Sequence, residues 1–268
     1  MKRFFTGSGR SVPDWACGWL ILATLLCCAH AHSTATEVKG AGIWRSDNIS
    51  TRLSKSNEEL LLENLKEITG LCELQFKENG QLHLGPVFES NRGSAAARKI
   101  LQRAIDSGFV FLVEDHSESS SVNFGQMDEG TTYEDALANR RFLIWRVRLD
   151  FKDFQKMQAP REVRESFSIG FTFLHELLHG LGHRDANQIQ EIGECEELVN
   201  QARTELNLPT RDQYFAEQLK ITGNYFTVRL RFRNQAHRRN QYLFFIAPPG
   251  SSLAELAEGV VVIKPKSN

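Results

Sequence analysis

The sequence predicts an α+β fold in which a twisted sheet precedes a strongly apolar helix, and a further helix and a C-terminal β-hairpin region follow it. Three observations point to this class. Several segments repeat their apolar residues with the period of an amphipathic helix. Residues 109–113 form the continuous apolar run of a buried strand, and residues 225–232 alternate between apolar and polar side chains.

The first half of the chain is expected to supply the early helices and the sheet. Residues 57–69 gather their leucines on one helical face, and Gly70 follows as a stop. Asn79-Gly80 is the strongest short turn signal in the chain and indicates a hairpin. The remaining expectations are a hairpin over 74–84, a helix over 94–106, a strand over 109–113, a loop over the Ser-, Glu- and Gly-rich residues 114–133, and a strand over 141–151.

The second half continues with two helices and a hairpin. The apolar rhythm of a helix extends over residues 162–181, and a second helix is expected over residues 187–206. Residues 225–232 and 242–246 are expected to pair as a hairpin, and residues 260–263 to form a last strand.

The most informative motif is H-E-x-x-H, which His175, Glu176 and His179 form within the predicted helix over 162–181. Side chains four residues apart lie one above the other on a helix, so both imidazoles can bind one metal ion. Glu176 is not needed as a ligand and can accept a proton from a water molecule beside the ion. The flanking residues are apolar, and burying these polar groups among them costs several kcal/mol unless they are paired or bind a metal.

The longer string from residue 175 to residue 185 reads H-E-x-x-H-x-x-G-x-x-D. It resembles the zincin metalloproteases, and within them the metzincin pattern of snapalysin-type secreted bacterial proteases. The resemblance is specific over about a dozen residues, and elsewhere it concerns only the order of elements. It implies a zincin-like fold in which His175, His179 and Asp185 bind the metal, Glu176 is the general base, and Gly182 makes the turn after the helix.

The third ligand has alternatives. Metzincins place a methionine turn downstream of it, whereas the methionines here are Met1, Met127 and Met157. In gluzincins, a related arrangement, the third ligand is a glutamate on a following helix, which here would be the helix over 187–206. The alternatives to Asp185 are Glu196, Glu194 and His183.

The resemblance implies a zinc metallopeptidase that hydrolyses peptide bonds, with Zn²⁺ as cofactor and a peptide or protein as substrate. The strand over 141–151 could pair with an extended substrate if it is an exposed edge, and an interior strand without that role is the other possibility. Two other functions stay open: a non-catalytic exported binding protein with this fold, and a metal hydrolase with a non-peptide substrate. The candidates for an oxyanion donor, which the sequence does not rank, are Tyr214, Tyr225, His237 and Tyr242.

The N-terminus predicts export. A basic segment precedes an apolar run over residues 15–28, and Ala29-His30-Ala31 offers a small-x-small cleavage site. The expected location is therefore secreted or periplasmic, without stable membrane association unless the signal peptide is uncleaved. The predicted organisation is a signal peptide over 1–31, a linker over 32–42 and a metallopeptidase domain over 43–268.

The composition limits the classes of partner. The formal net charge is −1 and both signs are mixed along the chain, so no nucleic-acid partner is expected. Beyond the predicted signal peptide the cysteines are Cys72 and Cys195. In an oxidising compartment they form one disulfide or remain two separate thiols.

Overall fold

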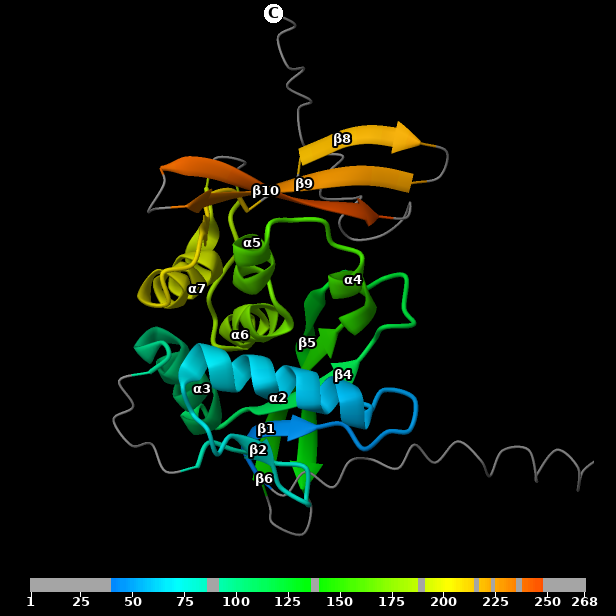
Figure 1. The fold of residues 1–268 in the computed structure, drawn as a ribbon. Helices are drawn as coiled ribbons and strands as arrows, with labels where there is room; N and C mark the ends of the chain where they lie inside the picture. Colours follow the sequence, from blue (N-terminus) through cyan, green and yellow to red (C-terminus); the bar gives the residue numbers. More distant parts are fainter. Residues whose placement is uncertain are drawn as a thin grey trace, which may run out of the picture. The chain divides into compact units, whose positions relative to one another are not determined.

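The computed structural model of the chain confirms the predicted α+β class (Figure 1). The residues that it describes are 40–85, 92–135, 140–187, 191–214, 217–222, 225–234 and 238–247. All of them belong to one compact unit, Glu37–Asn268. The predicted signal peptide over 1–31, nearly all of the predicted linker over 32–42 and the predicted strand over 260–263 lie outside the described residues. Within the described part, no helix is long and apolar enough to cross a membrane.

The first sheet is mixed. Its strands, in spatial order, are β1 (Gly42–Arg45), β4 (Val110–Asp115), β6 (Arg140–Leu149) and β5 (Gly125–Asp135). Strands β1, β4 and β6 run parallel, and β5 pairs antiparallel with β6. Strands β4 and β6 confirm the strands predicted over 109–113 and 141–151. Because β6 lies between β4 and β5, it is an interior strand, and the edge beside it is β5.

The loop predicted over 114–133 is wrong for much of its length, because residues from Gly125 onward form β5. The strand is polar and contains glycines and carboxylates, and a register shift falls between Asp128 and Thr131. Most of its described side chains are half-buried or exposed, so its sequence lacks the apolar pattern of a strand that is buried on both faces.

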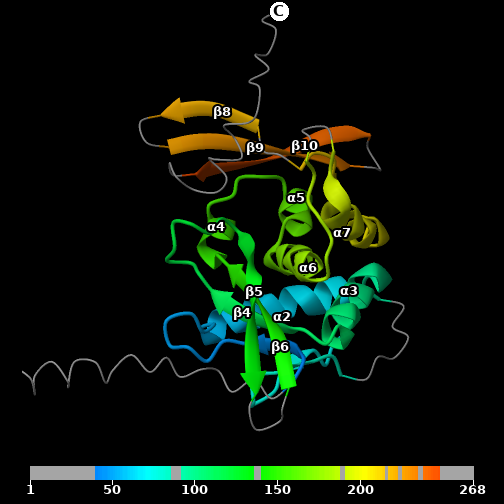
Figure 2. The same ribbon diagram turned by 180° about the vertical axis from the view of Figure 1, so that it is seen from behind.

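Three helices pack against one face of this sheet: α2 (Lys55–Thr69), α3 (Ala95–Asp106) and α6 (Ile169–Gly180) (Figures 1 and 2). Their apolar side chains share one buried core with Phe111 and Val147 of the sheet. Helices α2 and α3 confirm the helices predicted over 57–69 and 94–106. The short pair β2 (Gln75–Phe76) and β3 (Leu82–His83) confirms the predicted hairpin.

The single helix predicted over 162–181 is divided in the structure. Helix α5 (Arg161–Ser166) ends at Phe167, whose φ and ψ of −118° and 63° are not helical, and α6 begins after Ser168. Phe167 turns into a second core, whereas α6 fills the first. A straight helix could not place its apolar side chains in both cores.

The second sheet lies on the other side of α5 (Figures 1 and 2). Its strands are β7 (Thr210–Arg211), β8 (Glu217–Thr222), β9 (Tyr225–Asn234) and β10 (Arg239–Ala247). Strands β9 and β10 pair antiparallel, which confirms the hairpin predicted over 225–232 and 242–246. Phe232 and Phe245 of this sheet pack with Phe167 and with Phe124, which directly precedes β5.

Two helices complete the described unit. The short α4 (Phe151–Gln155) follows β6, and α7 (Gly193–Glu205) packs against α6. The helix predicted over 187–206 therefore starts later than expected. Its Cys195 N–H donates to the Arg184 carbonyl at 3.3 Å, which joins the start of α7 to the residues that follow α6. Residues 181–187, which follow α6, contain Asp185 and are part of the candidate site.

Candidate metal centre

Helix α6 carries both imidazoles of the H-E-x-x-H motif. The rings of His175 and His179 lie one helical turn apart, with centroids 5.1 Å apart and planes at 77°. The leucine and phenylalanine side chains around them are buried in the core. This packing holds the two imidazoles on one face of a rigid helix.

The loop after α6 brings Asp185 to the two imidazoles. Gly182 has a φ of 90°, a left-handed conformation that glycine adopts without strain, and the chain reverses there. One carboxylate oxygen of Asp185, Oδ1, lies 3.1 Å from Nε2 of His175. The other, Oδ2, lies 3.1 Å from Nε2 of His179. The carboxylate therefore faces the same nitrogen of both rings.

Two of the separations between these donor atoms suit a tetrahedral metal ion. Around zinc with ligands at about 2.0–2.1 Å, neighbouring donor atoms lie about 3.3 Å apart. The two separations of 3.1 Å between Nε2 and carboxylate oxygen are close to that value. Oδ1 of Asp185 is also buried without a hydrogen-bond partner among the described residues. His175, His179 and Asp185 are therefore suited to hold an ion, with one position left open.

The charges of these groups depend on one another. Burial alone lowers the pKa of His175, but the carboxylates of Asp185 and Glu196 outweigh it and raise that pKa to about 10. Burial likewise opposes the upward shift of the pKa of His179, which Asp185 and Glu176 cause. The pKa of Asp185 is well below its ordinary value, because the two imidazoles outweigh its burial. An ion that binds here must displace the protons of both rings, since imidazole ligates in its neutral form.

Glu196 lies on the opposite side of His175 from Asp185. It is only 1% exposed, and its Oε2 is 3.2 Å from Nδ1 of His175, although the angle is not that of a hydrogen bond. Its carboxylate also contacts the guanidinium groups of Arg203 and Arg211. Burial raises the pKa of Glu196, but these two arginines and His175 outweigh burial, so the pKa is well below its ordinary value. Glu196 therefore contacts the His175 ring at Nδ1, the nitrogen that does not face Asp185.

The other two alternatives for the third ligand lie together outside this arrangement. His183 Nδ1 is 3.5 Å from Oε2 of Glu194, and the same oxygen accepts from the Arg184 N–H at 3.4 Å. The structure thus places Asp185, rather than Glu194, Glu196 or His183, between the two Nε2 atoms.

Cys195 belongs to the same group of side chains, and the sequence did not indicate this. It is fully buried, and its Sγ lies 3.6 Å from Nδ1 of His179. Its thiol and one donor atom from each of His175, His179 and Asp185 lie within 4.8 Å of one another. Burial, with nearby carboxylates, raises the pKa of the thiol. Cys72 is exposed and both cysteines are free, so the possible disulfide is absent.

The side chain of Glu176 extends from α6 toward the edge strand β5. A Cβ atom on Gly125 would lie 2.5 Å from Cγ2 of Thr172 and 3.2 Å from Oε1 of Glu176, so the strand comes this close only because residue 125 is glycine. Burial raises the pKa of Glu176, opposed by the two imidazoles and by a hydrogen bond from the Met127 N–H. A carboxylate with a raised pKa is suited to accept and release a proton near neutral pH.

Of the four tyrosine and histidine residues considered as oxyanion donors, the structure places Tyr214 at the site. Its hydroxyl donates to Oδ2 of Asp185 at 2.5 Å, and its ring is stacked against His175 with centroids 6.2 Å apart. Tyr242 lies on β10 instead, with its ring 4.6 Å from the guanidinium of Arg229. His237 and the side chain of Tyr225 are outside the described part of the chain.

A cavity of about 110 Å³ adjoins the site. Its polar lining includes His175, Glu176 and Tyr214. Its apolar lining comes from both cores and consists of Phe124, Phe167, Phe171 and Leu230. Charged side chains of Glu196, Arg203 and Arg211 also line it, so the candidate metal centre opens into a small space with both aromatic and charged walls.

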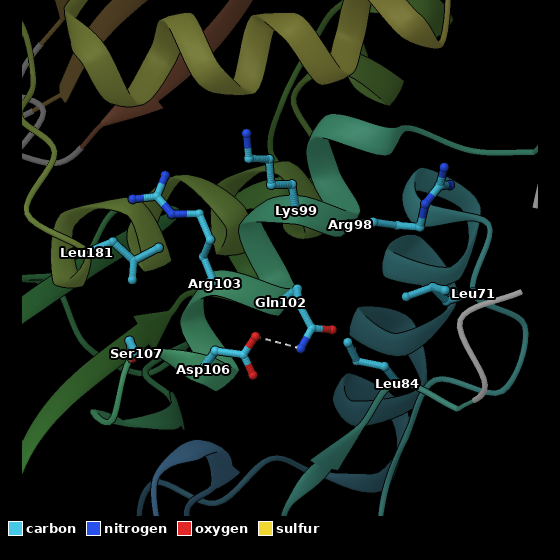
Figure 3. A pocket seen from close by; sticks show the side chains of 9 residues that line it. All are labelled: Leu71, Leu84, Arg98, Lys99, Gln102, Arg103, Asp106, Ser107 and Leu181. Carbon is cyan, nitrogen blue, oxygen red and sulfur yellow. Dashed lines mark hydrogen bonds between the residues drawn. The ribbon is translucent and has the colours of Figure 1, made fainter. Parts of the chain in front are cut away.

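A larger hollow of about 560 Å³ lies on the outer side of α3 (Figure 3). Arg98, Lys99 and Arg103 line it, and Gln102 donates to Asp106 at 2.9 Å. Its lining contains no histidine or cysteine, so it is not part of the metal centre.

Comparisons with protein-family models, with curated proteins and with solved structures find no match for this chain. The assignment of a function therefore depends on the sequence motif and on the geometry of the site.

Proposed function

We propose that this chain is an exported, zinc-dependent peptidase of the zincin type. The observation that carries the proposal is the position of Asp185, whose two oxygens each lie 3.1 Å from Nε2 of one motif histidine. Glu176 stands next to them, at the edge of the first sheet. Three ligands, an open position and a nearby carboxylate are what hydrolysis by a zinc site requires. Export with cleavage after Ala31 is part of the proposal and rests on the N-terminal sequence.

The ligands would be Nε2 of His175, Nε2 of His179 and the carboxylate of Asp185. When bound, zinc supplies a Lewis acid that polarises the scissile carbonyl and makes a water molecule more acidic. Glu196 supports His175 through its Nδ1 side, and Arg203 and Arg211 hold that carboxylate in place.

Glu176 carries the proton transfer. Its carboxylate accepts the proton that the attacking water loses and then gives it to the leaving amine. The Met127 N–H fixes the carboxylate beside the ligands, and burial raises its pKa, so that it accepts the proton and holds it until the leaving amine takes it. The same side chain thus serves first as base and then as acid.

The substrate would bind along the free edge of β5. That strand pairs with β6 on one side, and its start lies beside Thr172 and Glu176 of α6. An extended peptide that adds to this edge would be held by backbone hydrogen bonds, with its scissile bond near Glu176. This favours a peptide or protein substrate, and the small cavity beside the site would receive one of its side chains.

Chelation tests the proposal as a whole. The purified chain should bind one zinc ion, cleave members of a random peptide library, lose both properties after treatment with a chelator, and regain both when zinc is added back. Metal content and cleavage products, identified by mass spectrometry, are measured on the same samples. A chain that binds one zinc ion and cleaves no peptide would support a binding protein or a hydrolase with another substrate instead.

Tyr214→Phe tests the role of the phenol. The hydroxyl next to Asp185 can turn to the oxyanion as it forms, so kcat should fall about a hundredfold with KM almost unchanged. Tyr242→Phe, on β10, is the matched control and should be neutral. An unchanged kcat together with weaker zinc binding would mean that Tyr214 only orients Asp185.

A further inference from the structure

The first turn of α7 supports both metal-site imidazoles from the same side. Glu196 faces His175, with 3.2 Å between Oε2 and Nδ1. Its neighbour in sequence, Cys195, faces His179, with 3.6 Å between Sγ and Nδ1. Asp185 meets both rings at Nε2. Each ring is therefore contacted at one nitrogen by Asp185 and at the other by α7.

An imidazole that binds a metal through Nε2 carries its proton on Nδ1, and that proton needs an acceptor. For His179 the group in reach is the sulfur of Cys195, at a distance suited to an N–H···S hydrogen bond. Cys195 is fully buried, so water does not compete for this contact. Three carboxylates already act on the two imidazoles, those of Glu176, Asp185 and Glu196. A thiol offers an acceptor without adding a fourth carboxylate to the buried group.

We propose that Cys195 is a positioning residue that accepts a hydrogen bond from Nδ1 of His179, and so fixes the ring with Nε2 directed at the metal. This inference rests on the zinc site proposed above. The competing role is that of a fourth ligand, since the thiol and the other donor atoms lie within 4.8 Å of one another. A fourth protein ligand would close the position that a substrate needs. The contact at Nδ1, on the far edge of the ring from Asp185, favours the positioning role.

Cobalt(II) in place of zinc distinguishes the two roles in the full chain. Sulfur bound to cobalt gives an intense charge-transfer band in the near ultraviolet, and a hydrogen-bonded thiol does not. The wild-type cobalt form should lack that band. Its presence would identify Cys195 as a ligand and overturn the proposal.

Variants then measure the positioning effect. Zinc affinity under chelator competition should fall about 10–100-fold in Cys195→Ala, and Cys195→Ser should recover part of it, because a hydroxyl is also an acceptor. The visible cobalt spectrum should shift in Cys195→Ala and return toward wild type in Cys195→Ser. Cys72→Ser, at an exposed cysteine, is the matched control.

The outcomes separate the two proposals. Unchanged affinity and spectrum in Cys195→Ala would overturn the positioning role and leave the proposed peptidase intact. A wild-type chain that binds neither zinc nor cobalt would overturn the metal centre, and the role of Cys195 with it.

Discussion

Replacing Glu176 by glutamine should lower peptide cleavage at least about a hundredfold and leave zinc binding almost unchanged. Glutamine keeps the shape of the side chain, and its amide oxygen can still accept the hydrogen bond from the Met127 N–H. It cannot take a proton from water at neutral pH. The change therefore removes proton transfer and preserves the three ligands.

The measurement is kcat/KM on a peptide selected from the library, together with the zinc content of the same preparation. Glu197→Gln, at an exposed position on α7, is the matched control and should behave as wild type. If Glu176→Gln cleaves as fast as the parent chain, the assigned base is wrong. If it also loses zinc, Glu176 contributes to the metal site itself.

The sequence was sufficient where a local pattern determines the structure. The H-E-x-x-H spacing predicts two imidazoles on one helical face, because that follows from the helical repeat alone. Asn79-Gly80 and the alternation over 225–232 predicted hairpins for a similar reason, since turn type and strand period are local properties. The turn at Gly182 is likewise a local property, because glycine adopts the left-handed conformation that ends the helix.

Features that depend on tertiary neighbours were missed. Strand β5 cannot be predicted from the sequence, because its half-buried or exposed side chains show no apolar pattern and its pairing with β6 cannot be seen in its composition. The break at Phe167 reflects a second core, which is formed by strands far along the chain.

The contacts between α7 and the two imidazoles also cannot be predicted from the sequence. Cys195 and Glu196 act on two different imidazoles, and this depends on how α7 packs against α6. Sequence spacing makes Glu196 a candidate for the third metal ligand. It could not show which nitrogen of His175 the carboxylate faces.

Asp185→Ala and Glu196→Ala should differ most in how far each of them weakens zinc binding. Asp185 faces the two Nε2 atoms directly, so Asp185→Ala should remove a metal ligand. Zinc binding should weaken by far more than the roughly 10–100-fold that is usual when a residue that only orients a ligand is lost. Without zinc, Asp185 pairs with both imidazoles and accepts from the Tyr214 hydroxyl, so Asp185→Ala should also lower the unfolding free energy of the zinc-free protein. Zinc affinity by chelator competition and denaturant unfolding of the zinc-free form measure the two effects.

Glu196→Ala should weaken zinc binding much less and should lower stability strongly. The guanidinium of Arg203 is 2% exposed and pairs with Glu196, so removing the carboxylate leaves a buried charge unpaired. Such a loss costs about 3–5 kcal/mol of unfolding free energy even without zinc, while zinc affinity falls only about 10–100-fold. Glu196→Gln, which keeps an acceptor for Arg203, should recover part of the stability, and exposed Glu197→Ala should change neither quantity. If Asp185→Ala still holds one zinc ion under competition while Glu196→Gln does not, Glu196 is the third ligand and the arrangement is that of a gluzincin.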